Sequence, residues 1–299
     1  MQDLELSITI CSWNAKEDLR ACLASLRAIR EEASFEVIVV ENNSSDGSGA
    51  MVADEFPEVI LKQQFVNLGF CGGHNYAVGL MKGRSWLCLN SDTVVHAGSL
   101  RKMLDYLTSH PEIGILGPKL LNTDGSLQYS ARKFPNPVAA MFRNTILGRL
   151  FPNTKAVREY LMKDWDHDSI ADVDWVSGSA FLMSNEALQN VGVFDPEYFM
   201  FCEDVDLCWR TWKAGYRVVY LPEATITHHI GRSTDKAPNR MIGRFHRSMY
   251  HFYTKNQLPE APRWSRPFLK VLAATALTAR ASGFILKNKL DRIRRRLSR

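Results

Sequence analysis

The sequence predicts a single Rossmann-like α/β domain with a mostly parallel central sheet, flanking helices and a helical C-terminal extension. Short apolar runs alternate with segments of helical periodicity along most of the chain. The 299 residues have ordinary globular composition, with 45% hydrophobic and 23% charged residues, and can bury a core that is stable without further support. Positive charge gathers at the C-terminal end, which sets that end apart from the domain.

Short apolar runs in the first half of the chain predict strands. The run FEVIVVE is almost continuously apolar, which is typical of a parallel strand covered on both faces. The four strands expected in this half cover residues 4–11, 35–41, 58–63 and 85–90.

Helical segments separate these strands. KEDLRACLASLRAIR, residues 16–30, places Leu19, Leu23 and Leu26 on one stripe at helical spacing. Further helices are expected in SSDGSGAMVADEF, over about 73–83 and in SLRKMLDYLTSH.

The second half is expected to be more irregular. A strand over 113–121 leads into a loop-rich stretch that reaches about residue 170. After it we expect a strand over 174–184, a helix from about 203, two short strands in RVVYL and ATITHH, and a helix over 239–256.

Cysteine usage and the N-terminus indicate an intracellular protein. The six cysteines form no CxxC pair, so neither a zinc site nor a disulfide scaffold is predicted, and a reducing cytosol is favoured. The N-terminus lacks the basic start, apolar stretch and cleavage site of a secretion signal, so none is expected.

The basic character belongs to the tail alone. Residues 263–299 hold eleven Lys/Arg and one Asp, a net charge of +10, whereas the first 262 residues hold 26 Lys/Arg against 31 Asp/Glu. Lys270 and Arg280 interrupt the apolar stretch 268–286, which favours an interfacial amphipathic helix on anionic lipid over a membrane span. A solvated C-terminal helix is the alternative. Nucleic-acid binding is disfavoured, because the tail has few aromatic residues that could stack on bases.

Polar residues follow three of the predicted strands, whose carboxyl ends should share one edge of the sheet. SWN follows the first strand, ENNSSDGS the second and NSD the fourth. Trp13 could stack on a nucleobase or be partly buried in the core, and ENNSSDGS could be only a turn with an N-cap. Asp92 could end its strand in a turn or hold a divalent ion that bridges two phosphates.

Two further segments carry weaker signals. NLGFCGGHNYAVG, residues 67–79, has glycines at which the backbone could approach a ligand, and a helix N-terminus that favours anions. It is not GxGxxG and does not follow the first strand, which argues against a dinucleotide-binding dehydrogenase. His228 and His229 end an apolar strand and could be structural or, with a carboxylate, could bind Mn²⁺ or Mg²⁺.

Three acids crowd into FMFCEDVDLCWRTWKAGY, residues 199–216. In the first turn of a helix they are favoured by the macrodipole. Asp206 and Arg210 are four residues apart and can pair, which is a sufficient structural account of Asp206. Glu203 and Asp204 remain, and a carboxylate there could accept a proton from a substrate hydroxyl.

In this order the motifs resemble family 2 glycosyltransferases, the inverting enzymes of the GT-A fold, and among them rhamnosyltransferase-type members that build bacterial surface polysaccharides. The resemblance runs from about residue 7 to about 255. It implies a GT-A domain over 1–257, and the charge pattern of the tail then predicts a basic amphipathic helical extension over 258–299. The motifs that carry it are SITICSWN, VIVVENNSSDGS, NLGFCGGHN, LCLNSD, WVSGSAFLMS, FDPEYFMFCEDVDLCWRTWKAGY and HHIGRS.

The resemblance also implies roles for single residues. Asp204 matches the general base, and Glu203 would position the acceptor or the base. The segment Asn90-Ser91-Asp92 stands in place of the DxD motif, with Asn at its first acid, so Asp92 is the expected metal ligand. His228 is expected as a second ligand and is preferred to His229 by its spacing from a Gly-x-Ser.

Donor binding is implied for one further set of residues. Trp13 falls where an aromatic stacks on the pyrimidine, and Glu41 falls where an aspartate reads the base, although Glu is one methylene longer. The expected donor-binding residues are Trp13, Asn14, Glu41, Asn67, Gly73, Asn75, Asn90 and Asp92.

The implied activity is transfer of a sugar, with rhamnose expected, from a dTDP- or UDP-sugar to a hydroxyl of a glycan or polyprenyl-linked acceptor. Mn²⁺ or Mg²⁺ is the expected cofactor, and the cytoplasmic face of the plasma membrane is the expected location. One alternative is a nucleotidyltransferase of similar fold, which would carry a basic Gly-rich signature after the first strand. Another is a non-catalytic nucleotide-sugar-binding relative, which would lack Asp92 or the Glu203–Asp204 pair.

Overall fold

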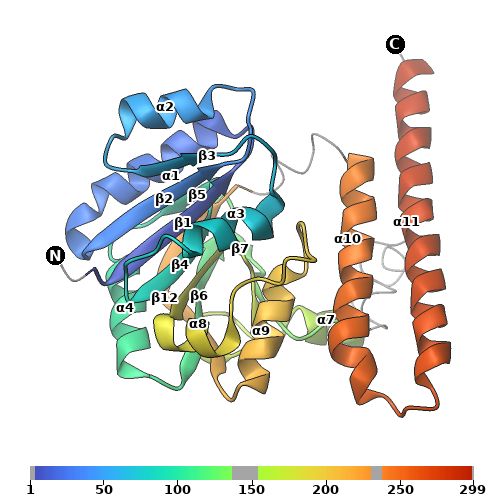
Figure 1. The fold of residues 1–299 in the computed structure, drawn as a ribbon. Coiled ribbons are helices and arrows are strands. Elements are labelled where there is room, and N and C mark those ends of the chain that lie inside the picture. The colour runs from blue at the N-terminus through green and yellow to red at the C-terminus, as the bar shows by residue number, and fades with distance from the viewer. Residues whose placement is uncertain (1–3, 137–153, 230–237, 298–299) are drawn as a thin grey trace.

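The computed structural model describes residues 4–136, 154–229 and 238–297, and it has an α/β body with a pair of long helices beside it (Figure 1). The main sheet has the order β3-β2-β1-β4-β11-β6-β12-β5, with β7 paired to β6 and β9 to β12. From β3 to β4 all pairs are parallel, β11 is antiparallel to both its neighbours, and β12 is parallel to β6. The predicted Rossmann-like α/β fold is confirmed.

Apolar, β-branched runs form the strands. The main sheet contains β1 (Leu6–Ser12), β2 (Phe35–Glu41), β3 (Ile60–Gln63), β4 (Ser85–Asn90), β5 (Thr93–Val95), β6 (Ile113–Leu121), β7 (Leu127–Gln128), β9 (Ala171–Asp172), β11 (Ala180–Ser184) and β12 (Arg217–His228). A second, two-stranded sheet contains β8 (Ala131–Arg132) and β10 (Trp175–Val176).

Helices cover both faces of the main sheet. One face packs against α1 (Lys16–Ala28), α2 (Ser48–Glu55) and α4 (Ser99–Ser109), and the other packs against α3 (Gly69–Val78), α8 (Asn185–Val191) and α9 (Glu203–Lys213). In α1 the predicted stripe of Leu19, Leu23 and Leu26 is buried. A 3₁₀ turn, Arg30–Glu32, follows α1, and α7 (Lys155–Tyr160) lies in the irregular stretch.

Successive side chains of β1 point to opposite faces of the main sheet. Leu6, Ile8 and Ile10 join the core under α1. On the other face the hydroxyl of Thr9 accepts a hydrogen bond from Trp86 Nε1 at 2.7 Å and lies 2.8 Å from His74 Nδ1. Burial lowers the pKa of His74 to about 3, so this imidazole is neutral in the folded protein.

Two strand predictions were wrong in detail. The segment 174–184 is not one strand, because the chain turns at Gly178 and passes from the small sheet to the main one. RVVYL and ATITHH are one strand, not two, with the pairing register shifted between Leu221 and Thr225. Pro222 lies within this irregularity, since it has no N–H to donate to the ladder.

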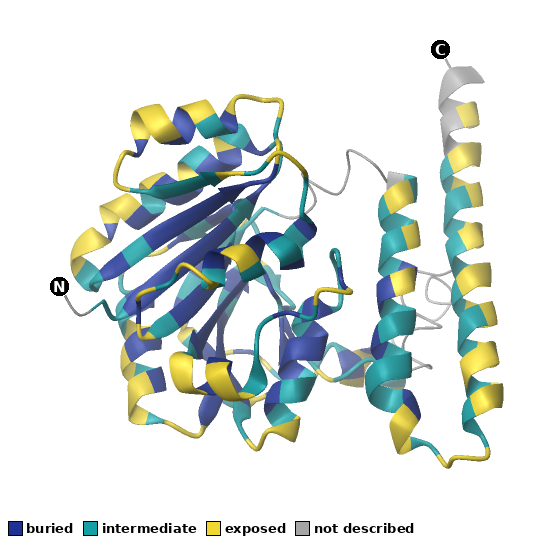
Figure 2. Cartoon of the chain, in the orientation of Figure 1, coloured by how far each residue is buried: buried dark blue, intermediate teal, exposed yellow. Residues whose placement is uncertain are grey.

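The two long helices form an antiparallel hairpin beside the body (Figure 1). They are α10 (Pro238–Phe252) and α11 (Arg266–Leu297), joined by a π-helical turn, Tyr253–Gln257, and a 3₁₀ turn, Leu258–Glu260. The predicted domain end at residue 257 therefore lies between the two helices. Figure 2 shows how little of α11 is covered: none of its residues whose exposure the structure describes is buried.

Candidate active site

The end of β4 and the end of β12 bring Asp92 and His228 together. Strand β5 pairs antiparallel with β12 in a register that sets His228 opposite Thr93, the residue after Asp92. His228 Nε2 lies 3.3 Å from Asp92 Oδ1, and both side chains are 11% exposed. The backbone N–H of His229 donates to the Asp92 carbonyl, whereas its imidazole Nδ1 lies 3.6 Å from Asp18 Oδ1. Of the two histidines, His228 therefore faces the Asp92 carboxylate.

Gln128 fixes the tautomer of His228. The amide nitrogen of Gln128 donates to Asn122 Oδ1 at 3.0 Å and to the His228 carbonyl at 3.2 Å. Its amide oxygen therefore faces His228 Nδ1, 2.7 Å away, and this nitrogen must carry the hydrogen. In the neutral imidazole Nε2 then presents a lone pair beside Asp92, with the amide nitrogen of Asn90 3.2 Å away. No motif pointed to Gln128, which lies 100 residues from His228 in the chain.

The loops after β1 and β2 interlock at the same edge of the sheet. The carboxylate of Glu41 accepts from the N–H of Ser44, and Asn14 accepts from the N–H of Ser45, each at 2.8 Å. Asn14 adopts a left-handed backbone with φ of 52°, and its own N–H donates to the Ser44 hydroxyl. Trp13 is half-buried beside these residues in the chain. Asn14 and Glu41 thus hold the loop where we expect the donor base.

The glycine-rich segment is packed against the protein itself. Asn67 accepts from the N–H of Gly69, and Asn42 binds both the carbonyl of Gly69 and the N–H of the residue before it. A Cβ on Gly69, whose φ is +77°, would lie 2.5 Å from the Phe199 carbonyl oxygen. Asn42 was within a predicted motif but was not singled out, although it ties the end of β2 to the start of α3.

Gly73 and Asn75 have similar structural explanations. A Cβ on Gly73 would lie 2.5 Å from Cys11 Sγ, so this glycine lets α3 approach β1. The Asn75 amide exchanges two hydrogen bonds with the backbone of Phe194, at 2.8 and 3.1 Å. Atoms of the chain occupy the Cβ side of Gly69 and Gly73, which accounts for these two glycines without a ligand. A donor contact by Gly73 stays a prediction. Donor contacts by Asn67 and Asn75 stay predictions.

Glu203 and Asp204 begin α9, as expected. The hydrogen-bond partners of the two carboxylates differ from each other. Asp204 accepts hydrogen bonds from the N–H groups of Gly178 at 2.9 Å and Val205 at 2.8 Å. Glu203 is buried, and its Oε2 has no hydrogen-bond partner. Burial, and then the Asp204 charge, raises the pKa of Glu203 well above its ordinary value. Burial also raises the pKa of Asp204, against the opposing effect of its two hydrogen bonds and of the Arg132 charge.

The pair therefore shares its charge unequally. Hydrogen bonds from backbone N–H groups favour the ionised form of Asp204, and no such donor reaches the free oxygen of Glu203. We assign the retained proton to Glu203 and the negative charge to Asp204. A carboxylate in this state can accept a proton, and a protonated Glu203 adds no charge beside it.

The turn between β10 and β11 joins this pair to the strand ends. Gly178 donates to Asp204, and the carbonyl of Ser179 accepts from the N–H of Asn90 at 2.9 Å. A Cβ on Gly178 would lie 3.3 Å from Asp204 Cβ, so glycine permits the approach. Asp204 is thus connected through two consecutive residues to the segment that carries Asp92. A glycine between serines inside an apolar run was the available signal for this turn.

The sequence is similar to known proteins over most of its length. A sequence model described as "Glycosyltransferase like family 2" matches residues 4–249. The N-acetylglucosaminyl-diphospho-decaprenol L-rhamnosyltransferase of Mycobacterium tuberculosis is 30% identical over 97% of this chain and 96% of its own length. Rhamnosyltransferase WbbL of Escherichia coli K12 is 28% identical over 74% of this chain and 82% of its own length.

Solved structures support the fold. The mannosyltransferase PcManGT of Pyrobaculum calidifontis, in complex with GDP-Man and Mn²⁺, aligns with a TM-score of 0.56 at 15% identity, covering 97% of this chain and 81% of that one. GalNAc-T7 with UDP, GalNAc and Mn²⁺ aligns with a TM-score of 0.57 at 13% identity, covering 76% of this chain and 44% of that one. Both are similar to this chain in their course through the α/β body.

Proposed function

The chain belongs to glycosyltransferase family 2, and from that membership we propose that it transfers rhamnose from a nucleoside-diphosphate sugar to a hydroxyl of a polyprenyl-diphosphate-linked glycan. The observation that carries this proposal is the hydrogen-bonded connection from Asp204 through Gly178 and Ser179 to the strand end of Asp92. The mycobacterial relative's name supports both sugar and acceptor, and the name of WbbL supports the sugar.

The proposed reaction is a single in-line displacement. The acceptor oxygen attacks the anomeric carbon and forms the new glycosidic bond, while its proton passes to Asp204. The bond to the diphosphate breaks, and the nucleoside diphosphate leaves with the electron pair. One displacement inverts the anomeric configuration. General-base assistance of this kind is typically worth ~10²–10⁴ in rate.

Residues at the strand ends fit a divalent cation. Asp92 offers a carboxylate, and His228 offers Nε2 while its Nδ1–H is held by Gln128, as a second-shell partner commonly does. Within the three described ranges no group of three His, Cys, Asp or Glu side chains gathers as a metal site, so further ligands would be diphosphate and water oxygens. Mn²⁺ or Mg²⁺ held there would offset the charge of the leaving diphosphate. The rest of the HHIGRS motif, from residue 230, lies outside the described residues.

We further propose that the exposed face of α11 rests on the membrane that carries such an acceptor. Trp264, just before the helix, is 85% exposed, and Phe268, in its first turn, is 69% exposed. By length and composition Arg266–Leu290 could also cross a bilayer. Lys270 and Arg280 lie within that stretch, which favours a helix in the interface with its cations toward anionic headgroups. The free cysteines support a cytoplasmic location, at the inner face of the plasma membrane.

A transfer assay with the full chain tests the function. Labelled dTDP-rhamnose, N-acetylglucosaminyl-diphospho-polyprenol and Mn²⁺ should yield a labelled lipid with inverted anomeric configuration. Incorporation of the nucleotide would instead indicate a nucleotidyltransferase. Binding without turnover, across a panel of dTDP- and UDP-sugars, would indicate a non-catalytic relative. Either result would overturn the proposal.

A further inference from the structure

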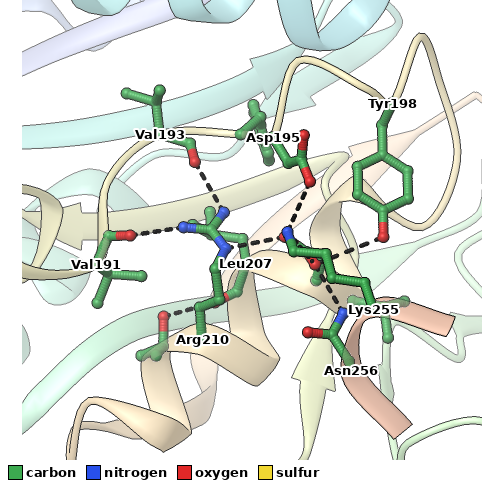
Figure 3. A network of polar contacts seen from close by, with 12 residues as sticks. Val191, Val193, Asp195, Tyr198, Leu207, Arg210, Lys255 and Asn256 are labelled. Carbon is green, nitrogen blue, oxygen red and sulfur yellow. Dashed lines mark hydrogen bonds and ion pairs between the residues drawn. The ribbon is translucent and has the colours of Figure 1, made fainter. Parts of the chain in front are cut away.

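A cluster of charged and polar side chains around the buried Asp206 carboxylate joins the helical hairpin to the helix that carries Asp204. Asp206, in the first turn of α9, is fully buried. Its carboxylate binds Arg210 of the same helix at 2.9 Å, Lys255 at 2.9 Å and Asn256 at 2.8 Å. Figure 3 shows Arg210 approaching from α9 while Lys255 and Asn256 approach from the π-helical turn after α10. The pairing of Asp206 with Arg210 was predicted; the partners from the hairpin were not.

Lys255 joins three segments at once. Besides Asp206 it binds Asp195 at 2.7 Å, in the loop that leads to α9 (Figure 3). Arg210 also donates to the carbonyls of Val191 and Val193 in that loop, at 2.6 and 2.8 Å. The ammonium of Lys255, which comes from the hairpin, is thus shared by the carboxylates of Asp195 and Asp206. Asp206 also pairs with Arg210, and Asp195 also lies 3.2 Å from His251 Nε2 of α10. Removing Lys255 leaves a buried carboxylate with half of its ionic partners.

The start of α9 depends on such outside support. The two residues before it, Phe201 and Cys202, have left-handed backbones with φ of 73° and 62°, and no side chain caps the helix at Cys202. Residues other than glycine hold this conformation only where their surroundings enforce it. Helix α10 contributes directly, because Ser248 donates to the Met200 carbonyl at 2.9 Å and the Arg244 guanidinium lies 3.6 Å from the centre of the Phe199 ring.

We propose that Lys255 and Asn256 are positioning residues for Asp204, acting through Asp206. Residues two apart on an α-helix point about 200° from each other, so Asp206 and Asp204 lie on opposite sides of the first turn. Contacts that hold Asp206 on one side of the helix therefore fix the direction of the Asp204 side chain on the opposite side. The hairpin is then part of the catalytic apparatus as well as a membrane contact. This inference rests on the proposed function for the role of Asp204.

Matched lysine variants of the full chain test the inference. Lys255→Met removes the ion pair with the buried Asp206 carboxylate. Lys213→Met is the control, because Lys213 also joins α9 to the C-terminal segment, through Glu260 at 2.6 Å, but at the far end of the helix with both side chains more than half exposed. Lys255→Met should lower kcat about 10- to 100-fold, the effect of displacing a catalytic group by about 1 Å, with the donor KM within about twofold. It should also shift the acid limb of the kcat–pH profile and speed amide hydrogen exchange at residues 203–208. Lys213→Met should change none of these, and Lys255→Arg should restore part of kcat.

Each outcome decides the inference. A folded Lys255→Met protein with unchanged kcat would overturn it, whether or not exchange at 203–208 becomes faster. So would an equal loss of kcat in Lys255→Met and Lys213→Met, because that would indicate general destabilisation. If Lys255→Met does not fold, Asn256→Leu replaces it, with the same fall in kcat expected and an unchanged kcat contradicting. If the wild-type chain transfers no sugar, the proposed function fails. Amide exchange at residues 203–208 in Lys255→Met would still show whether Lys255 stabilises the start of α9.

Discussion

Replacement of Asp204 by asparagine removes the proposed base but keeps its shape. Aspartate accepts one N–H at each oxygen, from Gly178 and from Val205. Asparagine keeps one acceptor and turns an NH₂ group against the other N–H, so one donor loses its partner at about 1–3 kcal/mol. Relief of the repulsion with Glu203 offsets part of this cost. Loss of the base should lower kcat by ~10²–10⁴, which corresponds to about 2.7–5.4 kcal/mol in the barrier.

Glu203→Gln is the matched comparison. Glutamine is neutral, as we infer the protonated Glu203 to be, so this variant should lose far less activity than Asp204→Asn. The pH profile provides a second reading. Because burial raises the pKa of Asp204, wild-type activity should fall with decreasing pH at a higher pH than the ordinary aspartate range. Asp204→Asn should lack this acid limb.

The assay is rhamnosyl transfer at saturating donor, with donor KM and a thermal melt measured for each protein. For Asp204→Asn the donor KM should stay near that of the wild type, since the base contacts the acceptor side. Near-normal turnover of Asp204→Asn would refute the base assignment. A larger loss in Glu203→Gln than in Asp204→Asn would show that the two carboxylates have been assigned the wrong way round.

Three other predictions concern the cation, the membrane and pH. EDTA should abolish transfer and Mn²⁺ or Mg²⁺ should restore it, and Asp92→Asn should require more added cation; full activity in chelator contradicts the metal role. Trp264→Ser combined with Phe268→Ser should reduce flotation of the full chain with anionic vesicles, whereas Phe65→Ser, at a 96% exposed aromatic of the body, should not; equal flotation of both proteins contradicts the α11 surface. With the pKa of His74 lowered to about 3, the unfolded chain binds this proton first as pH falls below about 6.5, so unfolding free energy should drop by about 2 kcal/mol from pH 7 to pH 5 on this account. His74→Gln should flatten that dependence, and an equal slope in urea titrations of both proteins would contradict it.

The periodicity of apolar residues predicted those strands and helices whose bounds depend on nearby residues. The continuous apolar run at 35–41 is β2 with the predicted bounds, and the stripe at Leu19, Leu23 and Leu26 is the buried face of α1. The segment 174–184 failed because its two halves pair with different sheets, which no local pattern reports. RVVYL and ATITHH were predicted as two strands, whereas a single strand continues through an irregularity between Leu221 and Thr225.

Candidate site residues were predictable where they follow a strand end or match a motif, and their long-range partners were not. Asp92 and Asp204 were identified by residue type and by resemblance. Gln128 and Lys255 were missed because their partners lie 100 and 49 residues away, and a lone amide or lysine carries no motif. The glycines at 69 and 73 were interpreted as room for a ligand, because their true neighbours, Phe199 and Cys11, become adjacent only in the fold.

The position of a bound Mn²⁺ ion and nucleoside diphosphate tests the central claim most directly. Anomalous diffraction from crystals of the full chain grown with dTDP and Mn²⁺ would locate both. We predict the ion at the Asp92 carboxylate and His228 Nε2, with the diphosphate between that ion and the end of α9 that carries Asp204. A nucleotide bound elsewhere, with the Asp92 and His228 side chains still in mutual contact, would contradict the account.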